Sequence, residues 1–265
     1  MSDISRRLGY GGSATVGGVQ VIITSGSFEQ ANTPSYLPMV DTPPSATSRA
    51  RVLHADGTAS YTGSLGFDLS VAAMSVVTTS TLLGRGYKFN VGINDGNDAY
   101  QMTDCLATSV ALTGAPGGIV SVSLSFMAQA GKASTIVTNN FIRDPTSSSG
   151  QMVGYWWSGG PDVRDWSLTM SQAVELVYGN KNSIEPLYLR YGLVDYILTA
   201  NIYKEVGTLF PDDTIAICTT KFQLTGKLQA KGYTFSGVTE LGTYAHTFET
   251  SALNDASGTV IQVVP

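Results

Sequence analysis

Positive charge is scarce in this chain of 265 residues. Lys and Arg number 15 against 20 Asp and Glu, which gives a net charge of -5 at neutral pH. This balance argues against a nucleic-acid-binding surface built on Lys and Arg. Charged residues of both signs make up 13% of the sequence, about half of the usual share. We therefore expect other copies of the chain, or partner proteins, to cover much of the surface.

Cysteine and histidine are nearly absent. Cys105 and Cys218 are far apart and show no CxxC or Cys/His spacing of a metal site, so we expect small, buried, reduced residues. His54 and His246 have no GxSxG or other nucleophile motif beside them, which leaves a hydrolytic triad without support. These absences predict a protein that is not an enzyme and that uses no cofactor and no metal.

Long apolar runs are also missing. No stretch approaches the ~18 apolar residues of a membrane-spanning helix, and the opening MSDISRRLGYGG lacks the apolar core of a signal peptide. We expect a protein that is made in the cytoplasm and does not associate with membranes.

Two short motifs suggest chemistry that their surroundings do not support. Residues 9–14 (GYGGSA) match G-x-G-x-x-A, but a dinucleotide site needs a strand before the motif and a helix after it. Residues 94–98 (NDGND) lack the frame of a calcium loop ending in Glu. Asp-Gly and Asn tolerate positive φ, so this segment predicts a hairpin turn instead.

Alternation with a period of two residues recurs through the whole chain, whereas helical periodicity is rare. The clearest case follows the turn Ala115-Pro116-Gly117-Gly118, where apolar residues alternate with Ser121, Ser123 and Ser125. Only residues 71–86 suggest a short helix. The sequence therefore predicts a mainly β protein with long strands, one face of which carries small polar side chains.

Composition divides the chain into two β units. We predict a first unit over residues 1–132, a linker over 133–150 and a second unit over 151–265. Residues 29–51 (EQANTPSYLPMVDTPPSATSRAR) are rich in Pro, Ser and Thr. Because Pro lacks the N–H that a sheet needs, we expect a long loop or arm there.

The two halves follow the same order of elements. The hairpin of residues 105–131 matches residues 228–253 in length and alternation, which predicts a tandem duplication of a β-sandwich or half-barrel. In the second hairpin, Thr243, Thr247 and Glu249 share the small polar face. Exposed edges of such long strands aggregate unless they are paired, so we expect sheets to join between chains into a ring.

Two segments carry a resemblance to a known family. The opening GGSATVGGVQVIITSGSFE and the hairpin DCLATSVALTGAPGGIVSVSLSFMA resemble the tail tube (major tail) proteins of tailed bacteriophages, and two tandem units resemble the duplicated members of that family. The resemblance implies a structural virion protein, assembled in the host cytoplasm. Three chains would form a ring with pseudo-sixfold symmetry, and rings would stack into the tube through which DNA is ejected.

The same resemblance implies partners and a role for the polar face. The tape measure, terminator and baseplate proteins would contact the tube, with a sheath where the tail has one, and genomic DNA would pass through without specific binding. A channel wall of short, uncharged or acidic side chains suits this task, because Lys and Arg would hold phosphate. Packing of the same face against a second sandwich layer is the alternative. The candidate lining residues are Ser121, Ser123, Ser125, Asp68, Asp104, Thr243, Thr247 and Glu249.

Subunit contacts are expected from the arm and from the segment GYWWSGGPDVRDW, which holds all three tryptophans. The candidate interface residues are Tyr36, Leu37, Met39, Trp156, Trp157 and Trp166. Two other functions remain open from sequence. A tail terminator, distal tail or baseplate hub protein of the same fold would make one ring and stop, and a β-sandwich module would use the tryptophans to bind host carbohydrate.

Overall fold

The computed structural model describes residues 13–38, 52–77, 81–94, 99–134, 163–179, 184–202, 214–218, 223–227, 229–236, 243–249 and 261–264. Within these residues the protein is mainly β, as the sequence predicts. Its strands are β1 (Ser13–Val16), β2 (Val19–Pro38), β3 (Val52–Asp68), β4 (Lys88–Asn94), β5 (Ala99–Gly114), β6 (Ser121–Ala128), β7 (Ala130–Ser134), β8 (Val163–Val177), β9 (Tyr188–Ile202), β10 (Thr214–Cys218), β11 (Gln223–Lys227), β12 (Gln229–Ser236), β13 (Thr243–Glu249) and β14 (Ile261–Val264).

Six strands close into a barrel in the first half of the chain. Antiparallel pairing runs in the order β1, β2, β3, β6, β5, β4 and returns to β1. Because the barrel is closed, each of its six strands has a neighbour on both sides. The interior is filled by large apolar side chains, among them Phe67, Phe126 and Leu124, all of which are buried. Phe126 makes edge-to-face contacts with Phe28 and Phe89, with ring centroids 5.7 and 6.0 Å apart.

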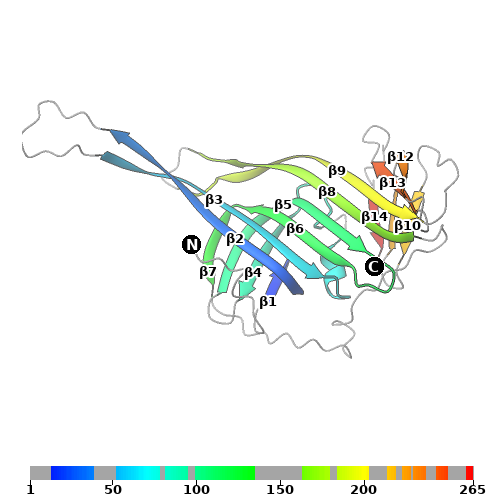
Figure 1. Cartoon of the computed structure of the whole chain (residues 1–265). Helices are drawn as coiled ribbons and strands as arrows, with labels where there is room; N and C mark the ends of the chain where they lie inside the picture. The colour runs from blue at the N-terminus through cyan, green and yellow to red at the C-terminus, as the bar shows by residue number, and fades with distance from the viewer. Residues whose placement is uncertain are drawn as a thin grey trace, which may run out of the picture.

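Strands from the second half extend the same sheet beyond the barrel. The carboxyl-terminal part of β5 pairs with β8, and pairing then continues through β9 and β13 to β12. Figure 1 shows β8 and β9 arching across the top of the barrel strands. A separate three-stranded sheet contains β10, β11 and β14.

The turn between β5 and β6 follows directly from its sequence. The Gly118 N–H donates to the Ala115 carbonyl at 2.9 Å, and Gly117 has φ +73°. Pro at the second position and positive φ at the third define a type II turn, for which glycine is the favoured third residue. The Pro-Gly pair thereby fixes the register of the serine-bearing hairpin.

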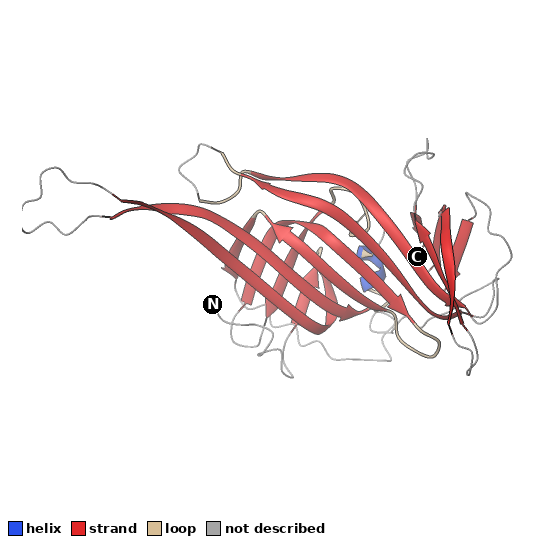
Figure 2. Ribbon diagram, turned by 45° about the horizontal axis from the view of Figure 1, so that its top comes forward, coloured by secondary structure: helices blue, strands red, loops and turns tan. Residues whose placement is uncertain are grey.

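The predicted loop over residues 29–51 is wrong for residues 29–38, which belong to β2 and pair with β3. Prolines are accommodated because Pro34 falls in a register shift between Thr33 and Ser35, and Pro38 ends the strand. A bulge leaves one residue outside the ladder, so the missing N–H costs nothing there. Figures 1 and 2 show the resulting ribbon of β2 and β3 projecting far beyond the barrel. Residues 39–51 lie outside the described residues.

Where the structure describes residues 71–86, the expected helix is reduced to one 3-10 turn, Ala73–Val76. Val and Thr restrict their own side chains in a helix, which weakens a longer one here. The connection is held instead by packing, because Leu82 and Leu83 are buried. Tyr196 of β9 donates its hydroxyl to the Leu83 carbonyl, so the connection also anchors β9.

The far end of the β8–β9 hairpin is fastened to the first half by hydrogen bonds. The Ala59 N–H donates to the Ile184 carbonyl at 2.8 Å, and the Tyr178 hydroxyl donates to the Ala59 carbonyl at 2.9 Å. Gln129 donates its amide to the Leu187 carbonyl at 2.7 Å. Together with Tyr196, these contacts hold β8 and β9 in one orientation against the barrel.

Candidate functional site

The outer face of the sheet carries rows of small polar side chains that cross up to six strands. Side chains directly opposite each other in a ladder share a face, so the register defines each row. The described rows are Asp68–Ser121–Thr113–Ser167–Thr199, Ser25–Gly66–Ser123–Ala111–Thr169–Ile197 and Ser27–Ser64–Ser125–Ser109–Ser171–Asp195. On β2 the partner of Asp68 is Ile22, which is buried, so we begin the first row at β3. We call these three rows the hydroxyl face.

Burial shows that the two faces of the sheet differ. In β6 every second residue is buried, while Ser121 and Ser125 are half-buried and Ser123 is exposed. No member of the three rows is buried within the described part of the chain. A second sandwich layer over the serines, the alternative left open by the sequence, is therefore not found among the described residues. The apolar face packs into the barrel and the hydroxyl face points outward.

Hydroxyl groups on the face bond to each other across strands. Ser27 and Ser64 have their Oγ atoms 2.8 Å apart, and Thr113 Oγ1 lies 2.8 Å from Ser121 Oγ. Each such bond uses up a donor and an acceptor that would otherwise be offered to a solute. The face is therefore polar, with short side chains whose hydrogen-bonding groups are partly satisfied by one another.

The charges on the hydroxyl face are all acidic. Asp68 and Asp195 each occupy one end of a row, and no Lys or Arg occurs in the three rows. Asp68 is half-buried and Asp195 is exposed. A phosphate chain near this surface would meet weak repulsion and would find no cation to bind.

The predicted lining residues of the second half lie on β13. Register places Thr247 opposite Thr199 and Glu249 opposite Ile197, which continues two of the rows by one strand. Thr243 pairs with Ser236 on β12. The ladder thus continues the row of Ser121 to Thr247 and the row of Ser123 to Glu249, whereas Thr243 lies in neither row.

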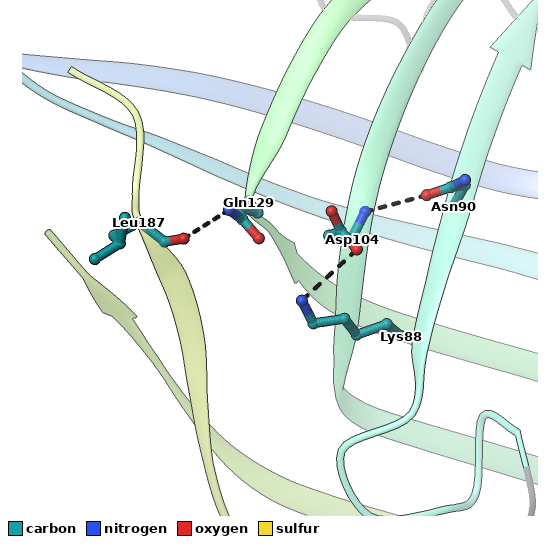
Figure 3. A network of polar contacts seen from close by, with 5 residues as sticks. All are labelled: Lys88, Asn90, Asp104, Gln129 and Leu187. Atoms are coloured by element: carbon teal, nitrogen blue, oxygen red, sulfur yellow. Dashed lines mark hydrogen bonds and ion pairs between the residues drawn. The ribbon is translucent and has the colours of Figure 1, made fainter. Parts of the chain in front are cut away.

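Asp104 is placed differently from the other candidates. It lies in the irregular part of the β4–β5 ladder with φ +51°, outside the three rows. Its backbone N–H donates to Asn90 Oδ1 at 3.1 Å, and its carboxylate lies 3.7 Å from the Lys88 ammonium (Figure 3). The structure does not bring Asp104 together with the serines, and an exposed ion pair of this kind contributes ~1 kcal/mol or less.

A pocket of about 360 Å³ hollows one end of the hydroxyl face beside the β5–β6 turn. The Asn201 amide donates to the Asp165 carboxylate at its edge. The lining residues are Thr113, Gly114, Ala115, Gly118, Ile119, Ser121, Asp165, Trp166, Ser167, Thr199 and Asn201.

The predicted interface residues fall into three groups. Trp166 is only 2% exposed and packs on Gly114, so it belongs to the core of its own chain and offers no free ring to a subunit or a sugar. Tyr36 and Leu37 lie in the projecting part of β2, where register pairs them with His54 and Leu53. Met39, Trp156 and Trp157 lie outside the described residues.

Sequence reasoning missed the contribution of β2, β8 and β9 to the face. The signal was available in β8, because Trp166, Leu168 and Met170 alternate with Ser167, Thr169 and Ser171. Alternation identifies which side chains of a strand face the core, and the residues between them then form the outer face. What alternation cannot supply is the neighbour of each strand, and hence the row.

Other kinds of site are not found in the described part of the chain. No group of three His, Cys, Asp or Glu there could hold a metal ion, and no helix there has the length and apolar character to cross a bilayer. The sequence matches no protein-family model and no curated protein.

Proposed function

We propose that this chain is a self-assembling structural protein whose rings stack into a tube, with the hydroxyl face lining a channel for DNA. The observation that carries the proposal is the face itself. Three ladder rows present Ser, Thr, Ala and Gly, with Ile197 as their one large apolar side chain and acidic residues as their only charges. In the setting that the resemblance suggests, the tube is the tail tube of a phage virion and its other partners are the remaining tail proteins.

Small, neutral or acidic side chains suit a conduit for a polyanion. Each Lys or Arg that neutralises a phosphate releases counterions and adds affinity, which would slow a moving genome. Bulky side chains would narrow the channel. A wall of short hydroxyls keeps a water layer beside the DNA, and the carboxylates of Asp68 and Asp195 oppose adhesion.

The number of strands supports a ring of three chains. Eight strands follow one another across the face in the order β2, β3, β6, β5, β8, β9, β13, β12. Three copies would give 24 strands. At about 4.8 Å between strands and ~40° tilt, the barrel backbone would be about 48 Å across, and ~38 Å would remain after about 5 Å of side chain per wall. DNA fits such a channel.

The projecting ribbon of β2 and β3 supports stacking. A two-stranded ribbon has little stability alone, because it lacks a third strand or a core to cover it. Contact with another copy would supply that cover. A contact between two different surfaces of identical chains is heterologous, and when it does not close it builds an open filament.

Negative-stain electron microscopy of the purified protein, with its mass in solution measured alongside, tests the proposal. We expect stacked rings with a central hole, built from trimers of about 84 kDa, three times the chain mass of 27.9 kDa. Closed single rings would favour the terminator, distal tail or hub function instead. A monomer at all concentrations, even with pre-formed tube ends added as initiators, would refute the tube.

A further inference from the structure

Two hairpins far apart in the sequence have the same ladder. In the β5–β6 hairpin, Ala111 pairs with Ser123 and Thr113 with Ser121. In the β12–β13 hairpin, Thr234 pairs with Ala245 and Ser236 with Thr243. Residues of β5 therefore correspond to residues 123 positions later in β12, and residues of β6 to residues 122 positions later in β13.

Irregularities of the two hairpins coincide as well. The β5–β6 ladder has one extra residue, Thr108, between Ala107 and Ser109. The β12–β13 ladder has one extra residue, Lys231, between Ala230 and Gly232. Thr108 and Lys231 are 123 positions apart, so the bulges occupy the same place. Bulges are specific local features, and their coincidence points to one structural unit used twice.

The other pair of hairpins shows the same correspondence. In the β2–β3 ladder the first register shift falls between Ile23 and Ser25, and in the β8–β9 ladder it falls between Val163 and Asp165. Both pairs differ by 140 positions. The sheet order of the first set is β2, β3, β6, β5, and that of the second set is β8, β9, β13, β12. The second register shifts, between Thr33 and Ser35 and between Gln172 and Val174, are displaced by one residue from this correspondence. The two sets thus agree in order, in register and in the position of the first bulge.

The two sets meet inside the chain through β5 and β8, with Thr113 opposite Ser167 and Leu112 opposite Leu168. The corresponding strands at the outer ends are β12 and β2. Among the described residues, β12 pairs only with β13, and β2 beyond Val21 pairs only with β3. The run of eight strands therefore ends in two strand edges, on β12 and β2. These edges correspond to the edges of β5 and β8 that are already paired at its centre.

We propose that β12 of one copy pairs antiparallel with β2 of the next copy, in the register that β5 and β8 use within the chain. This places Ser236 opposite Ser27, Phe235 opposite Phe28 and Thr234 opposite Glu29. The partner is a second copy of this chain, since the correspondence specifies this chain's own edge. The inference rests on the proposed function for the number of copies in the ring.

The stagger of the rows gives an independent check of closure. Starting at Ser27, the ladder leads through Ser64, Ser125 and Ser109 to Ser171. Ser171 corresponds to Ala31, so the row climbs four residues over four strands. One residue, about 3.3 Å, per strand spacing of about 4.8 Å corresponds to a strand tilt of about 35°. Closed barrels have this tilt, so repeated copies in this register would form one.

Engineered disulfides test the register. Direct partners in an antiparallel ladder lie within the Cα distance that a disulfide spans. Ser27→Cys and Ser236→Cys in one chain should give, on oxidation, a covalent ladder that ends at three chains. Each single variant should give no covalent multimer, and a mixture of the two should give dimers only. Glu29→Cys with Ser236→Cys, displaced by two residues, is the matched control, and the parent chain reports any linkage through Cys105 or Cys218.

The outcomes separate this inference from the proposed function. If tubes form but the matched pair of cysteines does not crosslink, or the displaced pair crosslinks more completely, the proposed register is wrong. The proposed tube function would still stand. Linkage of either single variant to itself would also overturn it, because that requires a symmetric contact. An absence of rings and tubes from the parent chain would remove both proposals.

Discussion

Tyr191 lies directly over Gly86: a Cβ on this glycine would lie 2.3 Å from the tyrosine ring. Gly86 also has φ +67°, and its N–H donates to Gln172 Oε1 at 3.1 Å. Beside it, Arg85 donates to the Gly192 carbonyl at 3.1 Å and holds its guanidinium 5.8 Å from the Tyr191 ring centroid. The connection between β3 and β4 is thereby clamped to β8 and β9.

Replacing Gly86 should therefore destabilise the protein more than replacing another glycine of similar backbone. Gly117 has φ +73° but open space around its Cβ position. We expect Gly117→Ala to cost ~1–2 kcal/mol through positive φ alone. Gly86→Ala should cost about 1–3 kcal/mol more, because the ring must move. Urea unfolding of both variants measures the difference, and equal losses would contradict the clamp.

The Tyr196 hydroxyl should give the stability a dependence on alkaline pH. Burial raises its pKa to about 12 from 10.0. The folded state holds this proton more tightly than the unfolded state. The hydroxyl therefore stabilises the folded protein fully below pH 10, and this stabilisation is lost as pH rises through 12. Tyr196→Phe should remove this component and cost about 1 kcal/mol at neutral pH through the lost bond to Leu83. Unfolding free energies of both proteins, measured from pH 8 to 12, test this prediction. If the variant shows the same dependence of unfolding free energy on pH as the parent, Tyr196 is not the source of that dependence.

Shortening the projecting ribbon should impair stacking but not folding. Asn32 and Ala59 are direct partners in the ladder, so an Asn-Gly turn can join them in place of residues 33–58. The barrel core lies outside the deleted segment, so the melting temperature of the monomer should change little. Electron microscopy should show rings without long tubes. Tubes of normal length from this variant would show that the ribbon has no part in stacking.

A cation on the hydroxyl face should make the assembled protein retain DNA. Ser123 is exposed in the middle of a row, and Ser123→Arg would place a positive charge from each copy along the channel. We expect DNA retention that falls with rising salt, as counterion release requires. Ser75→Arg is the control, because Ser75 is exposed on the 3-10 turn and belongs to no row. Equal retention by the two variants would show that the face does not line the channel.

The sequence by itself determined the β class, the tight turn at Pro116-Gly117 and the placement of Ser121, Ser123 and Ser125 on one face of a strand. These are local properties, because alternation and turn chemistry act within a few residues. It failed at residues 29–38, where composition suggested a loop. A bulge at Pro34 removed the conflict between proline and the ladder, and composition does not reveal a bulge.

Only the tertiary structure decided which strands are neighbours. Pairing of β5 with β8, of β3 with β6 and of β9 with β13 joins segments far apart in the chain, and no local pattern specifies such a partner. Those pairings turned separate serine strands into rows, put Trp166 into the core and left Asp104 outside the face. The physical reason is that a strand's alternation sets which side chains face outward, whereas packing of the whole barrel sets what stands beside them.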